Sequence, residues 1–266
     1  MMQDTILSLL PPDYPWKDRF HYFPILDSTN DRMRLLARQG APHGTVLVAS
    51  HQTSGHGRRG RSFHSPDGMG IYLTLLLRPD CKPTELMHLT CAAAVAMCDA
   101  VEKAAHLRPG IKWTNDLVCG KRKLGGILTE LGFTPEGRVN YAIIGIGINC
   151  CQQKSDFPEE ITSIATSLSL ITGQPVDRSQ VTAAMMEALW QMDQQLLSQP
   201  DGILARYRKD CITVGQEISL LRGEEIRYGR AVSVDDQGAL VVEFSDGHLE
   251  AVNSGEVSIR GMYGYI

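Results

Sequence analysis

The sequence predicts an α+β protein, with a central mixed sheet that has helices on one side, followed by a small C-terminal β-barrel. Three observations favour this fold. Buried strand-like runs and long apolar helical segments share the chain up to about residue 212. Beyond Thr213, short strands and glycine turns follow one another closely. The composition, 43% hydrophobic and 21% charged over 266 residues, is that of a globular protein with a substantial core. We therefore expect a lead-in at 1–24, a main domain at 25–212 and a barrel domain at 213–266.

The first part of the chain is predicted to be irregular and then to alternate between helices and strands. Residues 1–24 contain several prolines and little periodicity, so they carry no predicted element and are too short for a folded DNA-binding module. Ser28 or Thr29 caps a helix that ends near Gln39. The next elements are a strand at 45–50, a strand at 71–77 and a helix at 84–106.

The middle of the chain is predicted to supply the remaining strands of the sheet. Residues 111–119 have the composition of one strand that is interrupted at 114–116. Gly120 and Lys121 form a tight turn into a strand at 124–131. In the strand at 141–149, glycines indicate that another group approaches the backbone. The rest is a polar loop at 150–165, helices at 178–198 and 201–210, and barrel strands at 217–221, 226–234, 239–244 and 248–252.

Composition narrows the class of protein. The net charge of −4 argues against a general nucleic-acid binder, whose domains are usually basic. Seven cysteines form no C-x-x-C pair and follow no signal peptide, which predicts reduced thiols in the cytoplasm. No apolar run reaches the roughly 18 residues of a membrane span. We therefore expect a cytoplasmic protein that binds neither membrane nor nucleic acid.

Residues 51–61 read HQTSGHGRRGR and contain the spacing G-x-G-x-x-G of a dinucleotide-binding turn. That fold requires a helix directly after the glycines, but Pro66, Asp67 and Gly68 are typical of a turn. A phosphate loop of the G-x-x-x-x-G-K-[ST] type is also missing from the sequence. The segment 53–64, called the glycine loop below, is instead predicted to bind a multiply charged anion through its three arginines.

Polar side chains are concentrated in four segments near strand ends and helix starts. Each has a simpler explanation, with Ser28 as a helix cap, Lys123 as an exposed hairpin residue and Asn149 as a strand terminator. Together, however, the segments supply lysines, arginines, a carboxylate and neutral hydrogen-bonding groups. Such a set fits phosphoryl or adenylyl transfer, in which the protein mainly positions groups and neutralises charge. The segments are 28–30, 52–61, 112–116 with Lys123, and 145–149.

The stretches DSTND, QTSGHGRRGR, IKWTNDL…RKLGGIL and GIGIN occur in this order and make the chain resemble the biotin–protein ligases. The resemblance is close over residues 25–150, and the C-terminal barrel agrees with it in type and position. It implies a biotin/lipoate ligase-like catalytic domain, in a short form without an N-terminal DNA-binding domain. It also implies that ATP and biotin react to biotinyl-5′-adenylate, and that biotin then passes to one lysine of a biotin carboxyl carrier domain of a biotin-dependent carboxylase.

The resemblance also implies a set of site residues, with Mg²⁺ carried on the nucleotide phosphates and held in part by Asp116. Arg58 and Lys123 would neutralise the carboxylate and the α-phosphate as these join. The other biotin contacts are Ser28, Thr29, Asn30, Gln52, His56 and Gly57. The other ATP or adenylate contacts are Arg59, Arg61, Trp113, Asn115 and Asn149. The catalytic set is Lys123, Arg58, Asp116 and Lys112.

Two positions depart from the family pattern. Position 56 is His where the best-studied members have Arg, so a backbone contact is expected there in place of the usual side-chain role. No tryptophan follows Asn149 before Trp190, and Ala165 lies in the region that carries the adenine-stacking aromatic residue of some members.

Two other functions fit parts of the sequence. A lipoate–protein ligase shares the fold and the acyl-adenylate chemistry, but the R-R-G-R loop followed by K-W-x-N-D favours biotin. A regulator that only binds biotinyl-adenylate would carry an N-terminal helix-turn-helix, for which the lead-in is too short. We expect a monomer or weak homodimer, and the sequence does not identify the carrier protein.

Overall fold

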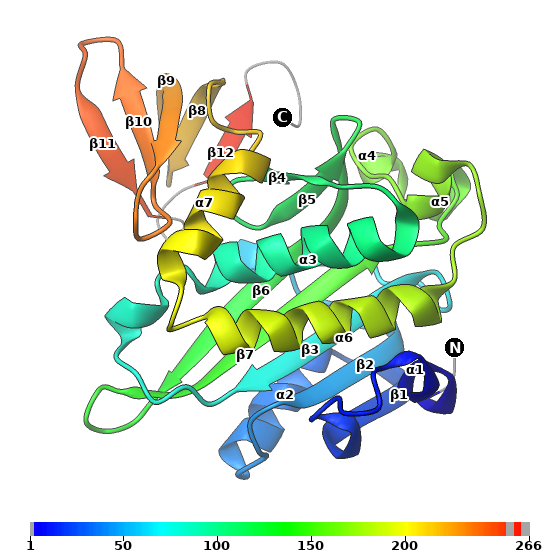
Figure 1. The fold of residues 1–266 in the computed structure, drawn as a ribbon. Coiled ribbons are helices and arrows are strands. Elements are labelled where there is room, and N and C mark those ends of the chain that lie inside the picture. The colour runs from blue at the N-terminus through cyan, green and yellow to red at the C-terminus, as the bar shows by residue number, and fades with distance from the viewer. Residues whose placement is uncertain (1–2, 254–257, 262–266) are drawn as a thin grey trace.

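The computed structural model describes residues 3–253 and 258–261 and contains a seven-stranded mixed sheet (Figure 1). The sheet order is β1-β2-β3-β7-β6-β5-β4. β1 and β2 are parallel, and all other neighbours are antiparallel. The strands are β1 Phe20–Leu26, β2 Thr45–Gln52, β3 Gly70–Leu77, β4 Gly110–Lys112, β5 Asp116–Cys119, β6 Arg122–Phe133 and β7 Val139–Asn149.

Helices cover both faces of this sheet, so the expectation that they lie on one side is wrong. α3 (Leu89–Ala105) and α6 (Arg178–Gln195) pack together over one face, and α2 (Thr29–Arg38) packs on the other. Successive strand residues point to opposite faces. On β2, Val46 belongs to the large core, whereas Leu47 packs with Met33 of α2. A strand that is apolar at consecutive positions is therefore covered on both faces.

The expected irregular lead-in is also wrong, because it contains a helix and an edge strand. α1 spans Gln3–Leu9, and a short 3₁₀ turn at Lys17–Arg19 precedes β1. Pro24 lies within β1, and a proline can occupy an edge strand because such a strand needs fewer ladder donors. Tyr14 and Trp16 are buried in the main core, which ties this segment to the rest of the fold.

Residues 110–119 form a hairpin and not one interrupted strand. β4 and β5 pair antiparallel with Ile111 opposite Leu117, so residues 113–115 form the hairpin turn. The predicted turn between β5 and β6 is confirmed. Gly120 and Lys121 both have positive φ, of 54° and 64°, as a two-residue turn of type I′ requires. The consequence is that Lys112, Asp116 and Lys123 lie on adjacent strands.

The stretch expected to be a polar loop contains short helices. A 3₁₀ turn at Lys154–Asp156 and α4 (Glu159–Thr162) lie within it, and α5 (Leu168–Thr172) follows. Further 3₁₀ turns occur at Arg58–Gly60 and Pro83–Leu86, and α7 spans Pro200–Asp210.

The C-terminal residues form a separate antiparallel sheet of five strands, as expected of a barrel-type domain. Its order is β11-β10-β9-β8-β12. The strands are β8 Glu217–Arg222, β9 Glu225–Val234, β10 Leu240–Phe244, β11 Leu249–Val252 and β12 Ser258–Gly261. The turn before β10 reaches the main domain, where the Trp113 indole donates to the carbonyl of Gly238 at 3.0 Å.

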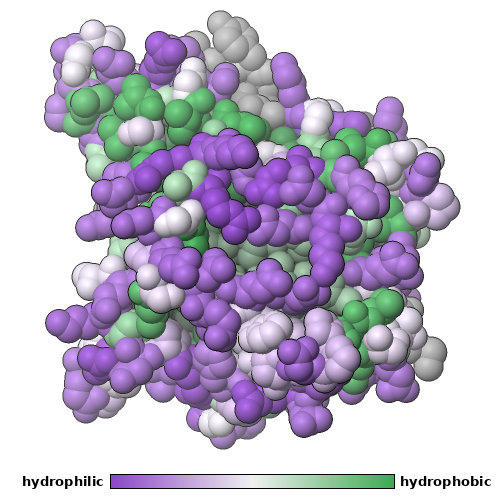
Figure 2. All heavy atoms as spheres, in the orientation of Figure 1, coloured by the Kyte–Doolittle hydropathy of each residue, from purple (hydrophilic) through white to green (hydrophobic). Residues whose placement is uncertain are grey.

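The face that carries α3, α6 and α7 is mostly hydrophilic at its surface (Figure 2). The segment Pro83–Ala105, which includes α3, is long and apolar enough to cross a membrane by length and composition, contrary to the sequence expectation. However, 72% of its apolar window is buried inside the protein, against the sheet and α6. α3 is therefore the central core helix of the main domain.

Candidate active site

A cavity of about 530 Å³ opens on the α2 face of the sheet. Its walls are the start of α2, the glycine loop, the β4–β5 hairpin, the first half of β6, the last residues of β7, and the segment 157–165. Every site residue that the resemblance implies lines it: Ser28, Thr29, Asn30, Gln52, His56, Gly57, Arg58, Arg59, Arg61, Lys112, Trp113, Asn115, Asp116, Lys123 and Asn149.

The cavity exists because β7 carries no side chains at two of its positions on this face. Ile144 and Ile148 point into the large core on the opposite face. Gly145 and Gly147 alternate with them, and both line the cavity. A Cβ atom on Gly147 would come within 2.5 Å of the Phe63 ring, and one on Gly145 would overlap Asn30 Oδ1. The glycines thus admit groups from α2 and the glycine loop to the sheet surface.

We expect Gly145→Ala to lower the free energy of unfolding by about 1–3 kcal/mol, because the added methyl group overpacks a buried site. The matched control is Gly202→Ala in α7. Nothing lies within 4 Å of a Cβ there, so alanine should stabilise the helix slightly. Thermal unfolding of the two variants should therefore shift in opposite directions, and equal shifts would contradict this account of β7.

Three residues, Thr29, Asn30 and Gln52, form a neutral polar patch that we call the cavity floor. Gln52 Oε1 accepts from both the backbone N–H and the hydroxyl of Thr29, at 2.8 and 2.9 Å. The hydroxyl of Thr74 donates to Asn30 Oδ1 at 2.8 Å. Ser28 caps α2 by accepting from the Asp31 N–H, and it lines the cavity as well. The floor is therefore a fixed set of donors and acceptors without net charge.

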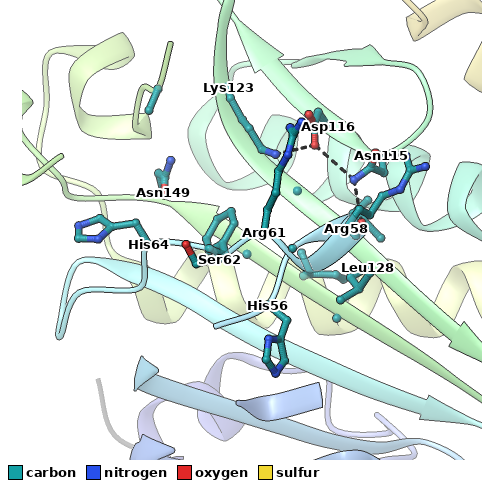
Figure 3. Close-up of a pocket in the computed structure, with 18 of the residues that line it drawn as sticks. His56, Arg58, Arg61, Ser62, His64, Asn115, Asp116, Lys123, Leu128 and Asn149 are labelled. Carbon is teal, nitrogen blue, oxygen red and sulfur yellow. Dashed lines mark hydrogen bonds and ion pairs between the residues drawn. The ribbon is translucent and has the colours of Figure 1, made fainter. Parts of the chain in front are cut away.

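At the other end of the cavity, cations and one carboxylate are linked in series (Figure 3). Arg58 Nη1 donates to Asn115 Oδ1 at 2.8 Å, and Asn115 Nδ2 donates to Asp116 Oδ1 at 3.3 Å. The same Asp116 oxygen lies 2.7 Å from Lys123 Nζ. Lys112 is 8% exposed and completes this cationic end of the cavity.

Burial lowers the pKa of the Arg58 guanidinium, and Asp116 opposes that shift while the neighbouring Arg59 adds to it. A guanidinium nevertheless stays charged at neutral pH. An anion in the cavity would stabilise such a partly desolvated cation. The cationic end is therefore suited to a negatively charged ligand or transition state.

The glycine loop is a small hairpin that folds over the cavity. The Gly57 N–H donates to the Arg61 carbonyl at 2.6 Å, and the Phe63 N–H to the Gly55 carbonyl at 2.8 Å. Arg59 and Gly60 at the tip have positive φ, of 58° and 71°. No helix follows the loop, since residues 70–77 form β3. The described residues between the glycine loop and β3 therefore lack the helix that a dinucleotide turn requires.

The sequence analysis missed one apolar wall of the cavity, formed by Phe157, Ile161 and Ile164. These residues lie in or beside a single short helix turn, so no periodicity marked them. This segment is joined to β6, because the Lys123 N–H donates to the Ile164 carbonyl at 2.7 Å. Ala165 lines the cavity as well, together with Leu128, Ser62 and His64.

Comparison with known proteins agrees with this arrangement. Residues 22–149 match the profile of the biotin/lipoate A/B protein ligase family, and residues 213–260 match the biotin protein ligase C-terminal domain. The chain belongs to the biotin/lipoate A/B protein ligase family. Within the family it is similar to biotin–protein ligases, as the following matches show.

The bifunctional ligase/repressor BirA of Bacillus subtilis is 36% identical over 90% of the chain and 73% of its own length. The biotin–[acetyl-CoA-carboxylase] ligase of Mycobacterium tuberculosis is 31% identical over 86% of the chain and 85% of its own length. The biotin protein ligase of Aquifex aeolicus, solved with biotin and ATP, superposes with a TM-score of 0.78 at 30% identity and covers 91% of the chain and 99% of that structure.

Proposed function

We propose that this protein activates biotin with ATP to biotinyl-5′-adenylate and transfers the biotin to a lysine of a biotin carboxyl carrier protein. The single observation that carries the proposal is the geometry of the cavity, in which a neutral floor faces a cationic end. The relatives from M. tuberculosis and Paracoccus denitrificans, both biotin–[acetyl-CoA-carboxylase] ligases, support it. So does the similarity to the Aquifex structure that holds biotin and ATP.

The floor suits the ureido head of biotin. A ureido ring offers one carbonyl acceptor and two N–H donors, and Thr29, Asn30 and Gln52 present neutral groups of both kinds. Ser28 and backbone groups of His56 and Gly57 would complete this end. Because the floor carries no net charge, it would leave the carboxylate tail of biotin to extend toward the cationic end.

The cationic end suits the joining of two anions. A carboxylate oxygen of biotin attacks the α-phosphorus of ATP, a new O–P bond forms, and pyrophosphate leaves with the electron pair of the broken P–O bond. Arg58 and Lys123 offset the repulsion between the two anions and stabilise the charge of the transition state. Asp116 holds the Lys123 ammonium in place at 2.7 Å. In the second step, the carrier lysine attacks the activated carbonyl carbon and AMP leaves.

The remaining assignments concern the nucleotide. Asn149 and Trp113 would contact the adenosine part, with Asn115, Arg59 and Arg61 nearer the phosphates. Among the described residues, no group of three or more His, Cys, Asp or Glu side chains could hold a metal ion. The donor set therefore fits Mg²⁺ bound mainly by the nucleotide phosphates, with Asp116 as its protein carboxylate.

One experiment tests the proposal directly. The protein is incubated with biotin, ATP and a carrier domain, and the intact mass of the carrier is measured. A mass increase of one biotinyl group is expected. In a parallel assay of ATP–pyrophosphate exchange, exchange that depends on lipoate and not on biotin would instead favour a lipoate–protein ligase.

Hydrogen exchange in the glycine loop should slow when biotin and ATP are added. Ligand anions would relieve the repulsion between Arg58, Arg59 and Arg61 and would hold the loop over the cavity. Mass spectrometry should therefore show increased protection in peptides covering 53–64, while peptides from α1, far from the cavity, serve as the control. Unchanged protection in the loop would contradict its role in ligand binding.

A further inference from the structure

Five side chains from three segments form one continuous series of contacts beside the cavity. His56 Nε2 of the glycine loop lies 2.7 Å from Asp31 Oδ2 on α2. Arg34, one turn further along α2, donates to Asp31 at 2.6 Å. Arg34 also donates twice to Glu130 Oε2 on β6, at 3.0 and 2.6 Å. Glu130 Oε1 accepts from Asn30 Nδ2 at 2.9 Å. The series thus joins the loop to the cavity floor.

The two ends of the series differ from its middle. His56 and Asn30 line the cavity, whereas Asp31, Arg34 and Glu130 are not among its lining residues. The three middle residues are therefore connected to the cavity through the two ends of the series.

Asn30 is held in one orientation by its neighbours. Its side chain donates to Glu130, accepts from the Thr74 hydroxyl and packs against Gly145. The residue is 5% exposed, so a rotated amide would lose buried hydrogen bonds. One N–H and one lone pair of this amide remain available to a ligand.

Arg34 and the carboxylates of Asp31 and Glu130 stabilise one another through ion pairs. The hydrogen bond to Glu130 raises the pKa of Arg34. Burial raises the pKa of the Asp31 carboxyl. Hydrogen bonds from His56 and Arg34 lower it by a larger amount, so the pKa lies below its usual value. The Asp31 carboxylate therefore stays ionised beside Arg34 at neutral pH. Removing Arg34 would leave the two carboxylates without their shared cation and break the series at its centre.

We propose that Arg34 and Glu130 are positioning residues that couple closure of the glycine loop to occupation of the cavity floor. The inference rests on the proposed function, in which the floor holds the ureido ring of biotin. A ligand that fixes the Asn30 amide favours the position of Glu130 that pairs with Arg34. Arg34 in turn orients Asp31 toward His56. By linkage, a closed loop favours the bound floor to the same degree.

The test compares Arg34→Gln with Arg38→Gln in the full chain. Arg38 is an exposed arginine one turn further along the same helix, so the control removes the same charge from the same element. Biotin affinity is measured by calorimetry and the KM for ATP by pyrophosphate exchange. Arg34→Gln should weaken biotin binding about tenfold, as expected for losing hydrogen bonds to charged groups. The KM for ATP and the affinity of the control should stay near the wild-type values.

Coupling is tested by a double-mutant cycle with His56→Ala. If the two residues act through one series, the double variant should bind biotin no more weakly than the weaker of the two single variants. With biotin bound, amide hydrogen exchange in the glycine loop should also be faster in Arg34→Gln than in the wild type. Thermal unfolding checks that each variant is folded, and Glu130→Gln replaces Arg34→Gln in the cycle if the latter is not.

Two results would overturn the inference. One is a double variant whose fold-loss of biotin affinity equals the product of the two single losses. The other is an affinity of Arg34→Gln equal to that of Arg38→Gln. A merely structural role for Arg34 would lower the unfolding temperature without a selective loss of biotin affinity. Failure of the proposed function would be seen separately, since the wild-type protein would then show no biotin-dependent exchange.

Discussion

Replacing Lys123 by alanine is expected to reduce biotin-dependent pyrophosphate exchange by about 10²–10³-fold, the usual cost of losing one transition-state contact. The ammonium lies at the cationic end of the cavity and is held by Asp116 at 2.7 Å. Its backbone is fixed independently, because its N–H donates to Ile164 and its carbonyl accepts from Thr166. The variant should therefore keep the strand in place while it loses the charge. The measurement is the rate of biotin-dependent pyrophosphate exchange.

Lys121→Ala is the matched control for this prediction. Lys121 is an exposed lysine in the turn just before β6, so its loss changes the net charge equally. Its exchange rate should remain near that of the wild type. If a folded Lys123→Ala protein also kept its exchange rate, Lys123 would have no part in the chemistry.

Replacing Arg58 by lysine is expected to release biotinyl-adenylate before transfer. Arg58 Nη1 donates to Asn115 Oδ1 at 2.8 Å, and the residue lines the cavity, where a planar guanidinium suits the phosphate of an adenylate. Lysine keeps the charge but cannot reproduce this geometry. A mixed anhydride survives only while the closed loop excludes water. The variant should therefore label lysines of bystander proteins, detected by mass spectrometry after incubation with biotin and ATP.

Arg58→Gln distinguishes whether Arg58 retains biotinyl-adenylate or only attracts anions. If Arg58 only attracted anions, lysine would restore normal behaviour and only glutamine would be defective. If its planar group retains the intermediate, both variants should label bystander proteins more than the wild type does. Labelling by Arg58→Lys at the wild-type level would reject the retention role.

The sequence predicted the cavity residues better than it predicted the architecture around them. Chemical motifs such as Lys112–Asp116 identify a site by residue type and order, whatever the strand pairing. The β4–β5 hairpin was missed because its turn residues were interpreted as an interruption within one strand. β1 was missed because Pro24 lies within it, and a proline in such a run argues against a strand except at the edge of a sheet.

Contacts between distant segments could not be predicted from the sequence. Glu130 lies 100 residues from Asn30 along the chain, and Arg34 lies 96 residues from Glu130. Nothing in the local sequence distinguishes these residues from ordinary solvated charges on a helix and a strand. Their pairing depends on α2 packing on the face of the sheet opposite to α3 and α6.

The alternation of isoleucine and glycine along β7 determines why substitutions at each position of this strand would be lost. Ile144 and Ile148 face the hydrophobic core, whereas Gly145 and Gly147 face the cavity. In a library that varies each position of the strand, changes at the isoleucines should be lost through reduced protein abundance. Changes at the glycines should be lost both because they overpack the strand and because the added side chain fills the cavity. Alternate residues of this strand would then be selected for different reasons, for core packing at the isoleucines and for an open cavity at the glycines.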